Sequence, residues 1–454
     1  MSRRMGTSVA QGPCASIATQ RPWRDWSVVL VYSAATGLLV VGFTMLSDAA
    51  SDVFRSLEHL DGVWRWSTLI WTPTLTVALL AWTRRYAPGA MGSGVPQVML
   101  ALDERTSASQ RARLVSLRLS LHKIGLVAGG LLAGLSIGRE GPAVQVGAGA
   151  MLHARRWLSP RAGLDAHSLM VAGAAAGIAA AFNTPLGGIA FALEQLSHRR
   201  NLSHSALMLV AILSSAGLAI AILGDFPYFG ELRAQRLTVS HAFPGLLVIV
   251  ITGLSGGLFA RLLVASTRGM PDRFSRWRAE HPLRFAAGCS LAVALIGIAT
   301  HGATTGTGYV QTRALLEGGN EVTPTYSLLK FCATWLSTWV GVPAGVFAPS
   351  LAIGAGIGRD VANICDISGD AAVPLIALGM VSFLAATTQG PITAFIIVME
   401  MVGGHAMVLS LMAAALLSSG VARRLTRPLY SELAAHLEPS AVPGDPSGED
   451  RARR

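Results

Sequence analysis

Charged residues are scarce in this sequence of 454 residues, at 13% where an average soluble domain has about 25%. This scarcity excludes an ordinary soluble protein, and a hydrophobic content of 52% excludes a disordered chain. Lysine is almost absent, since Lys123 and Lys330 are the only two. The net charge is +11, but the charges form short clusters between apolar runs, so we expect membrane headgroups and no nucleic acid as their partner.

Cysteine is also rare, and the four residues Cys14, Cys289, Cys332 and Cys365 show no CxxC spacing. Neither a zinc site nor a disulfide framework is indicated, and buried free thiols are the simpler interpretation. The sequence therefore predicts no cofactor and no metal.

Long apolar runs are abundant, and the mean hydropathy is +0.50. The first run begins at Trp26 and continues to Leu46 without a small-residue cleavage site, which predicts an uncleaved first membrane helix after a cytoplasmic segment, residues 1–26. Ten or more membrane segments are expected in total. Further apolar stretches lie near 67–82, 120–137, 168–193, 205–223, 243–265, 285–300, 326–357, 373–399 and 406–422.

Arginine clusters lie between these runs, and both ends of the chain are basic. Because basic residues concentrate on the cytoplasmic side, the sequence predicts a multi-pass protein of the cell (inner) membrane with both termini in the cytoplasm. The clusters comprise Arg111, Arg113 and Arg118, then Arg155 and Arg156, Arg199 and Arg200, Arg273, Arg276 and Arg278, and finally Arg423, Arg424 and Arg427.

An internal repeat interrupts the apolar runs at corresponding places. Gly138–Pro142 and Gly345–Pro349 share a Gly-x-x-x-Pro frame 207 residues apart, and Pro185 with Glu194 recurs 206 residues later as Pro391 with Glu400. Broken helices at matching positions of two membrane repeats point to a substrate site between them near the bilayer midplane. We therefore predict an all-α membrane protein with a first repeat at 27–223, a linker at 224–239, a second repeat at 240–430, and a short disordered cytoplasmic tail at 431–454.

The segment Gly92-Ser93-Gly94-Val95-Pro96 is either a flexible loop before a helix or an anion site. Its backbone N–H groups, the serine hydroxyl and the N-terminus of a following helix could hold an anion without a full positive charge. Such weak binding suits an ion that must also leave.

Glu140 is the acid to watch, because a carboxylate inside an apolar segment is costly and is a functional hypothesis by default. An Arg139–Glu140 pair at a helix end is the structural alternative, but adjacent residues do not face each other on a helix. At an anion site the carboxylate would compete for the same N–H donors until a proton released it, which would make it a gate that reads pH.

These motifs, with a late Tyr430, resemble those of the CLC chloride channels and transporters of the short prokaryotic type, over about residues 27–435. Lys123, seventeen positions before Glu140, also matches that family. The resemblance implies a central chloride held by the hydroxyls of Ser93 and Tyr430 and by the backbone N–H groups of Val346 and Phe347. It also implies that Glu140 is the extracellular gate, that the two repeats are inverted, and that the protein is a homodimer with one pore per subunit.

Gln195 departs from the pattern of the family's exchangers. In those proteins the second acid of a Glu-Glu pair takes protons from the cytoplasm, whereas here Glu194 is followed by Gln195, whose amide does not titrate. The resemblance thus favours chloride transport with weak proton coupling or channel-like behaviour. The alternatives are a proton-coupled chloride antiporter or a fluoride or nitrate carrier, although Ser93 resembles the chloride branch.

An enzyme is the rival from another class, because Gly134-Leu135-Ser136-Ile137-Gly138 fits the Gly-x-Ser-x-Gly pattern of hydrolases. That pattern needs a strand–turn–helix context, whereas this stretch lies in a glycine-rich apolar segment. The sequence contains neither a His-Glu-x-x-His zinc motif nor a phosphate-binding Gly-x-x-x-x-Gly-Lys loop. We therefore expect no enzymatic activity.

Overall fold

The computed structural model describes residues 22–58, 66–160, 162–196, 205–224, 227–230, 241–269, 273–319 and 323–437. This described part of the chain is almost entirely helical, and its only extended pairings are two isolated bridges. The predicted all-α class is confirmed. Most of the N-terminal segment, much of the linker and residues 438–454 of the tail lie outside the described residues, so the predictions for them stay predictions. The prediction of a disordered tail is wrong for residues 431–437, which continue the helix that begins at Leu429.

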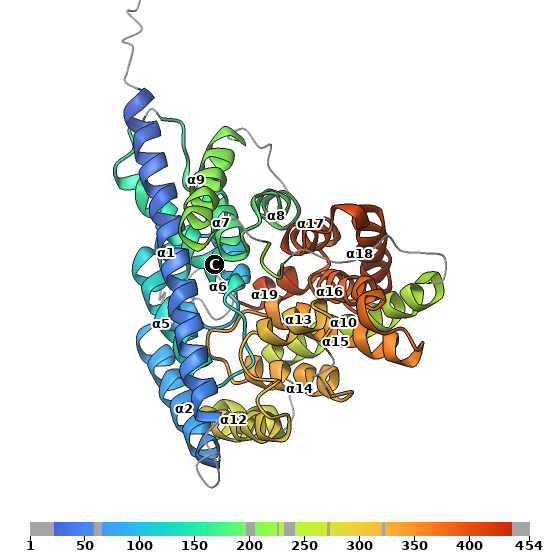
Figure 1. Cartoon of the computed structure of the whole chain (residues 1–454). Coiled ribbons are helices and arrows are strands. Elements are labelled where there is room, and N and C mark those ends of the chain that lie inside the picture. The colour runs from blue at the N-terminus through green and yellow to red at the C-terminus, as the bar shows by residue number, and fades with distance from the viewer. Residues whose placement is uncertain are drawn as a thin grey trace, which may run out of the picture.

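Elements of the first half run along one side of the molecule, coloured blue to green in Figure 1. They include long helices, short helices that begin directly after a break in the apolar pattern, and a π-helical turn at Ala192–Leu196. The α-helices are α1 (Pro22–Glu58), α2 (Thr68–Tyr86), α3 (Val95–Leu102), α4 (Ala108–Leu114), α5 (Leu117–Leu132), α6 (Glu140–His153), α7 (Ala166–Phe182), α8 (Pro185–Phe191) and α9 (Ser205–Leu223), with 3-10 turns η2 (Pro88–Ala90) and η3 (Ala154–Arg156).

Most elements of the second half occupy the other side, coloured yellow-green to red in Figure 1, whereas α12 lies beside α2 of the first half. They are α10 (Ala242–Arg268), α11 (Arg273–Glu280), α12 (Pro282–Ala299), α13 (Tyr309–Leu316), α14 (Tyr326–Trp339), α15 (Phe347–Ile364), α16 (Val373–Thr388), α17 (Pro391–Met401), α18 (Val408–Ala422) and α19 (Leu429–Leu437), with 3-10 turns η6 (Gly369–Ala371) and η7 (His405–Met407).

Seven helices among the described residues are long and apolar enough to cross a membrane. Other apolar runs are divided into shorter helices, so the ten or more segments suggested by the sequence are not all continuous spanning helices. The run at 168–193, for example, splits into α7 and α8. A helix needs about 20 residues to span the hydrocarbon core, so α8 with 7 residues and α17 with 11 cannot cross it alone.

Two left-handed residues make equivalent breaks in the two halves. Asn183 (φ 56°) ends α7 and Gln389 (φ 54°) ends α16, and these residues lie 206 positions apart. The left-handed conformation stops each helix, and the proline that begins the next helix has no N–H to lose there. Pro185 and Pro391 therefore start α8 and α17 in a new direction.

Glycine contacts pack the central helices in the same repeated way. Gly147 of α6 lies against the backbone of Gly173 in α7, and Gly354 of α15 lies against the backbone of Gly379 in α16. A methyl group at any of these positions would overlap the facing backbone, so glycine is what lets these helices approach closely. The pairs α6–α7 and α15–α16 are thus structural counterparts, and both are almost wholly buried.

Candidate functional site

Three loops from the two halves meet where α6 and α15 begin. Gly138 and Gly345 exchange two backbone hydrogen bonds, with N···O distances of 2.7 and 2.9 Å, and the Ala344 N–H donates to the Gly92 carbonyl at 3.2 Å. These bonds form the two isolated bridges of the described structure. They hold the N-termini of two broken helices at one place, as the duplicated Gly-x-x-x-Pro frame predicts.

Close approach of the backbone explains the glycine at position 345. A Cβ atom there would lie 2.7 Å from the Gly138 carbonyl oxygen and 2.9 Å from Pro142 Cδ. Both neighbours are rigid, so no other residue fits without moving the loops. The glycine of the motif Gly345–Pro349 is therefore needed for the two loops to pack together, and the same motif also begins α15.

The two lysines fix the glycine-rich loops of the two halves. The buried Lys123 ammonium donates to the carbonyls of Ala90 and Gly92, both at 2.7 Å. Lys330, 207 positions later, is also buried and donates to carbonyls of the equivalent loop, including Gly306 at 2.9 Å. The sequence motifs single out Lys123 alone, although the repeat offset also points to Lys330.

The residues proposed to hold the central anion are gathered at this junction. Ser93 and Tyr430 are both buried with neighbouring hydroxyl groups, and neither hydroxyl makes a well-formed hydrogen bond within the described residues. The ring of Tyr430 stacks on that of Phe347, with 5.9 Å between centroids and 17° between planes. Val346 and Phe347 stand at the N-terminus of α15, where backbone N–H groups lack helical partners.

Unpaired donors in a buried space give this site its chemical capacity. A buried hydroxyl without a partner costs free energy, so such groups in a native protein call for an explanation. The hydroxyls of Ser93 and Tyr430 and the N–H groups at the α15 N-terminus can donate hydrogen bonds to an anion. Such binding is of modest strength, because the helix end carries only partial positive charge.

Glu140 is completely buried beside the same helix end. Its Oε2 accepts the Ala348 N–H at 3.4 Å, while Oε1 has no hydrogen-bond partner within the described residues. The carboxylate thus occupies one N–H donor of α15, that of Ala348, which an anion could use. This placement agrees with the competition expected for a gate, although the gating role itself stays a prediction.

Arg139 forms its hydrogen bonds and its ion pair with residues other than Glu140, which agrees with the argument that adjacent residues do not satisfy each other. Its buried guanidinium donates to the Thr44 carbonyl and the Tyr228 hydroxyl, both at 3.1 Å, and it forms an ion pair with Asp48. Sequence reasoning missed Asp48 and Tyr228. No spacing signals them, because these partners come from α1 and from a loop, residues 227–230, and meet Arg139 only in the folded chain.

Two glutamates bind the short helices α8 and α17 reciprocally. Glu194 accepts the N–H groups of Ile392 and Thr393 at 3.0 and 2.7 Å. Glu400 accepts those of Leu186 and Gly187 at 3.1 and 2.7 Å. Each carboxylate therefore caps the helix of the other half. The sequence indicates Glu400 only as the repeat partner of Glu194, and it does not predict the cap.

We call the two reciprocal caps made by Glu194 and Glu400 the clasp. Gln195 lies next to the clasp, on the π-helical turn Ala192–Leu196. Its side chain is buried and packs against Gly390, directly before α17. Of the two residues considered for the proton pathway, Glu194 is thus bound to backbone N–H groups, and Gln195 occupies a buried position without a titratable group.

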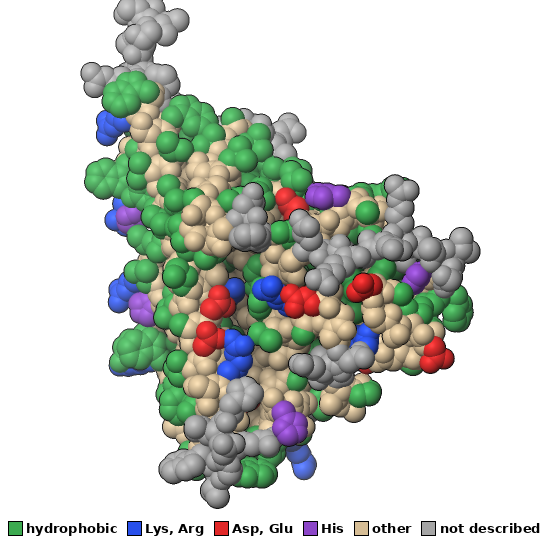
Figure 2. Space-filling model, in the orientation of Figure 1, with side chains coloured by type: hydrophobic (Ala, Val, Ile, Leu, Met, Phe, Trp, Pro, Cys, Tyr) green, Lys and Arg blue, Asp and Glu red, His purple; other side chains and the backbone are tan. Residues whose placement is uncertain are grey.

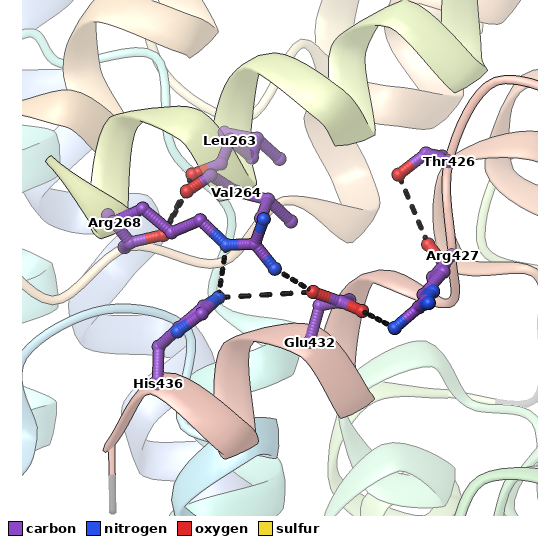
Figure 3. Close-up of polar contacts among 8 residues, drawn as sticks. Leu263, Val264, Arg268, Thr426, Arg427, Glu432 and His436 are labelled. Atoms are coloured by element: carbon purple, nitrogen blue, oxygen red, sulfur yellow. Dashed lines mark hydrogen bonds and ion pairs between the residues drawn. The ribbon is translucent and has the colours of Figure 1, made fainter. Parts of the chain in front are cut away.

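Helix α19, which carries Tyr430, is fastened to the end of α10. Figure 3 shows Arg268 of α10 paired with Glu432, which also contacts Arg427 at 3.5 Å and His436 at 3.9 Å. Arg268 donates a second bond to His436 Nε2. The Tyr430 side chain is therefore presented from a helix tied to the body by an ion-pair cluster.

The hydrolase pattern has a packing explanation. The Ser136 hydroxyl lies 2.8 Å from that of Thr334, and its N–H donates to Ser337 Oγ at 3.0 Å, so this buried serine joins the loop between α5 and α6 to α14. Within the described residues, no three His, Cys, Asp or Glu side chains lie close enough together to hold a metal ion. Cys289, Cys332 and Cys365 are free, but only Cys289 is buried as expected, since Cys332 and Cys365 are partly exposed. Cys14 lies outside the described residues.

The fold and site define a multi-pass membrane protein whose broken helices meet at a buried polar site. A sequence profile described as "Voltage gated chloride channel" matches residues 74–423. The chain belongs to this family, and the resemblance to CLC proteins is confirmed.

Individual relatives support the same family. The H(+)/Cl(-) exchange transporter ClcA of Cronobacter sakazakii is 30% identical over 445 residues, covering 90% of this chain and 89% of that protein. The ClcA of Yersinia pestis (bv. Antiqua, strain Angola) is 28% identical over 457 residues, covering 94% and 92%.

Two solved structures share the fold. One is a slow cyanobacterial Cl-/H+ antiporter, with a TM-score of 0.75, 23% identity, and coverage of 92% of this chain and 98% of that chain. The other is a CLC-type fluoride/proton antiporter, with a TM-score of 0.73, 22% identity, and coverage of 89% and 96%.

Proposed function

We propose that this protein carries chloride across the inner membrane through a CLC-type pore, with Glu140 as its gate. The observation that carries the proposal is the junction of Ser93, Tyr430 and the α15 N-terminus, where buried donors lack partners and Glu140 takes a neighbouring N–H. Chloride bound by the hydroxyls and by the N–H groups of Val346 and Phe347 would be held by neutral donors. Such binding is strong enough for entry and weak enough for release.

Gln195 is the residue that bears on whether chloride transport is coupled to protons. The relatives named above are H(+)/Cl(-) exchange transporters, so a proton-coupled chloride antiporter is the second candidate. The missing acid at position 195 and the capping bonds of Glu194 support weak coupling or channel-like transport instead. Fluoride or nitrate carriage is a further alternative, which the serine at position 93 disfavours.

Purified protein in liposomes tests the proposal directly. Chloride efflux recorded with a chloride electrode, and proton movement recorded with a pH electrode in the same vessel, should show chloride transport above that of protein-free liposomes. Ser136→Ala serves as the control, because the hydroxyl of that serine contacts Thr334 of α14 and its loss should leave the flux intact. Chloride efflux no faster than in empty liposomes, with monodisperse protein, would refute chloride transport.

A homodimer covering α8 and α17 completes the proposal. The two helices are too short to span alone, and Leu186 and Ile392 are exposed directly beside the carboxylates of Glu400 and Glu194. Facing this clasp toward lipid would be costly, whereas a second copy would cover it. The molar mass from light scattering in detergent should therefore be that of two chains, and a monomer at all concentrations would contradict the dimer.

Both termini are proposed to be cytoplasmic. The arginine pair at Arg155 and Arg156 lies at the same end of the molecule as the start of α1, because the neighbouring Ser159 binds Asp25 with distances of 2.7 and 2.9 Å. Positive charge concentrated at this end supports a cytoplasmic position.

A further inference from the structure

A groove with a basic rim opens on the side of the first half, away from the proposed ion path. It lies between α4, the start of α5 and the end of α6, and has a volume of about 630 Å³. We call it the basic groove. It is lined by apolar side chains, including Leu117, Leu121 and Leu152, and by basic ones, Arg111, Arg118, His153, Arg155 and Arg156.

The rim carries positive charge without an acidic counterpart. None of the residues that line the groove is acidic. Arg118, Arg155 and Arg156 are exposed, and no ion pair within the described residues neutralises them. In Figure 2, basic and histidine side chains lie along the edge of the molecule where Figure 1 places α5. This edge is therefore complementary to an anion.

Arg111 is held in place at the wall of the groove. Its Nε donates to the Ala101 carbonyl at 2.9 Å and its Nη2 donates to the Thr106 carbonyl at 3.3 Å. A guanidinium has five N–H donors, so these two bonds leave others available. The groove thus combines one arginine held by hydrogen bonds with three exposed ones.

We expect the groove to lie near the membrane surface. It sits at the end of the molecule where α1 begins, since η3 carries Arg155 and Arg156 and the nearby Ser159 binds Asp25. Trp157, next to the arginine pair, is 57% exposed, and tryptophan is enriched at the interface between headgroups and acyl chains. An occupant of the groove would therefore come from the bilayer.

We propose that the basic groove binds one anionic phospholipid. The phosphate would lie among the guanidinium groups of Arg118, Arg155 and Arg156. Part of an acyl chain would cover the leucines that line the groove, Leu117, Leu121 and Leu152. Guanidinium groups recognise phosphate through bidentate hydrogen bonds, and basic pockets between membrane helices are typical headgroup sites. This site is separate from the ion path, so its failure would leave the proposed transport function untouched.

Lipid retention measured by native mass spectrometry tests the site. The protein is exchanged into micelles with phosphatidylglycerol or phosphatidylcholine at equal concentration, and the bound lipids per chain are counted. The wild type should retain phosphatidylglycerol in preference to phosphatidylcholine. The triple variant Arg118→Gln/Arg155→Gln/Arg156→Gln should lose one phosphatidylglycerol per chain, with affinity lower by at least about tenfold.

The chain supplies a matched control, because Arg423 and Arg424 also form an Ala-Arg-Arg sequence after a membrane helix. Arg423→Gln/Arg424→Gln should keep the wild-type lipid count. Arg155→Lys/Arg156→Lys, which preserves the charge, should retain more lipid than the glutamine variant and shows that the segment folds.

Three outcomes would overturn the proposal. Equal retention of the two lipids by the wild type would remove the anionic preference, and equal losses in the groove variant and its control would remove the site. Displacement of the lipid by millimolar inorganic phosphate would show that the groove takes a free anion and that the acyl chain contributes nothing.

Discussion

Glu140 is the residue whose surroundings say most about control of the path. Its carboxylate is buried at the N-terminus of α15, where the partial positive charge of the helix favours an anion, and one oxygen lacks a partner within the described residues. We expect a carboxylate in this position to occupy the place of the transported ion. Protonation removes its charge and with it most of its attraction to the N–H donors.

A pH profile of chloride flux is the test at this residue. In the wild type the flux should rise as the external pH falls, by up to about tenfold per pH unit while the carboxylate is titrating. Glu140→Gln imitates the protonated state, so its flux should already be high and nearly independent of pH. A variant that keeps the wild-type profile would show that Glu140 is a structural acid at a helix end.

Ser93 offers the second prediction at residue scale. Its hydroxyl is a neutral donor beside that of Tyr430, and Ser93→Pro would remove both this donor and a backbone N–H. The variant should prefer nitrate over chloride more strongly than the wild type does, by about tenfold for the loss of a buried donor. The ratio of the nitrate flux to the chloride flux in liposomes measures this preference. An unchanged ratio would show that Ser93 does not bind the central anion.

At the scale of elements, the junction between α6 and α15 depends on backbone contact. Gly345→Ala would place a methyl group 2.7 Å from the Gly138 carbonyl oxygen, and relief would require the two loops to separate. We expect a loss of about 1–3 kcal/mol in stability and a distorted anion site. Thermal unfolding in detergent and chloride flux would both report the change.

Gly42→Ala is the control for that substitution, since a Cβ atom at Gly42 in the middle of α1 meets nothing within 4 Å. It should be neutral or slightly stabilising. If the two alanine variants unfold at the same temperature, the Gly138–Gly345 contact does not limit the packing of the junction.

The sequence predicts these elements to the extent that local chemistry and repetition determine them. Glycine and proline mark the helix breaks, and the repeat offset of about 206 residues is by itself enough to relate Asn183 to Gln389 and Lys123 to Lys330. The partners of Arg139 could not be predicted, because Asp48 and Tyr228 lie on separate elements whose approach depends on the packing of the whole chain.

At the scale of the whole molecule, the reciprocal caps join the two halves at the short helices α8 and α17. Glu194 binds the start of α17 and Glu400 binds the start of α8, so the clasp is nearly symmetric. Loss of either carboxylate should cost about 1–3 kcal/mol, because bonds to a charged acceptor are the stronger ones. This symmetry provides a way to separate a structural glutamate from a proton carrier.

The last prediction concerns proton uptake driven by an outward chloride gradient in liposomes. The wild type should move protons weakly, because Gln195 cannot accept one and Glu194 is occupied by two N–H groups. Gln195→Glu should strengthen the uptake.

Glu194→Gln and Glu400→Gln should resemble each other, lowering stability with no selective effect on coupling, since Glu400 lies at the equivalent cap of the other half. A selective loss of proton movement in Glu194→Gln alone would identify that carboxylate as the carrier. Strong uphill proton movement in the wild type that survives Glu194→Gln would defeat the expectation of weak coupling and indicate that water leads protons to Glu140.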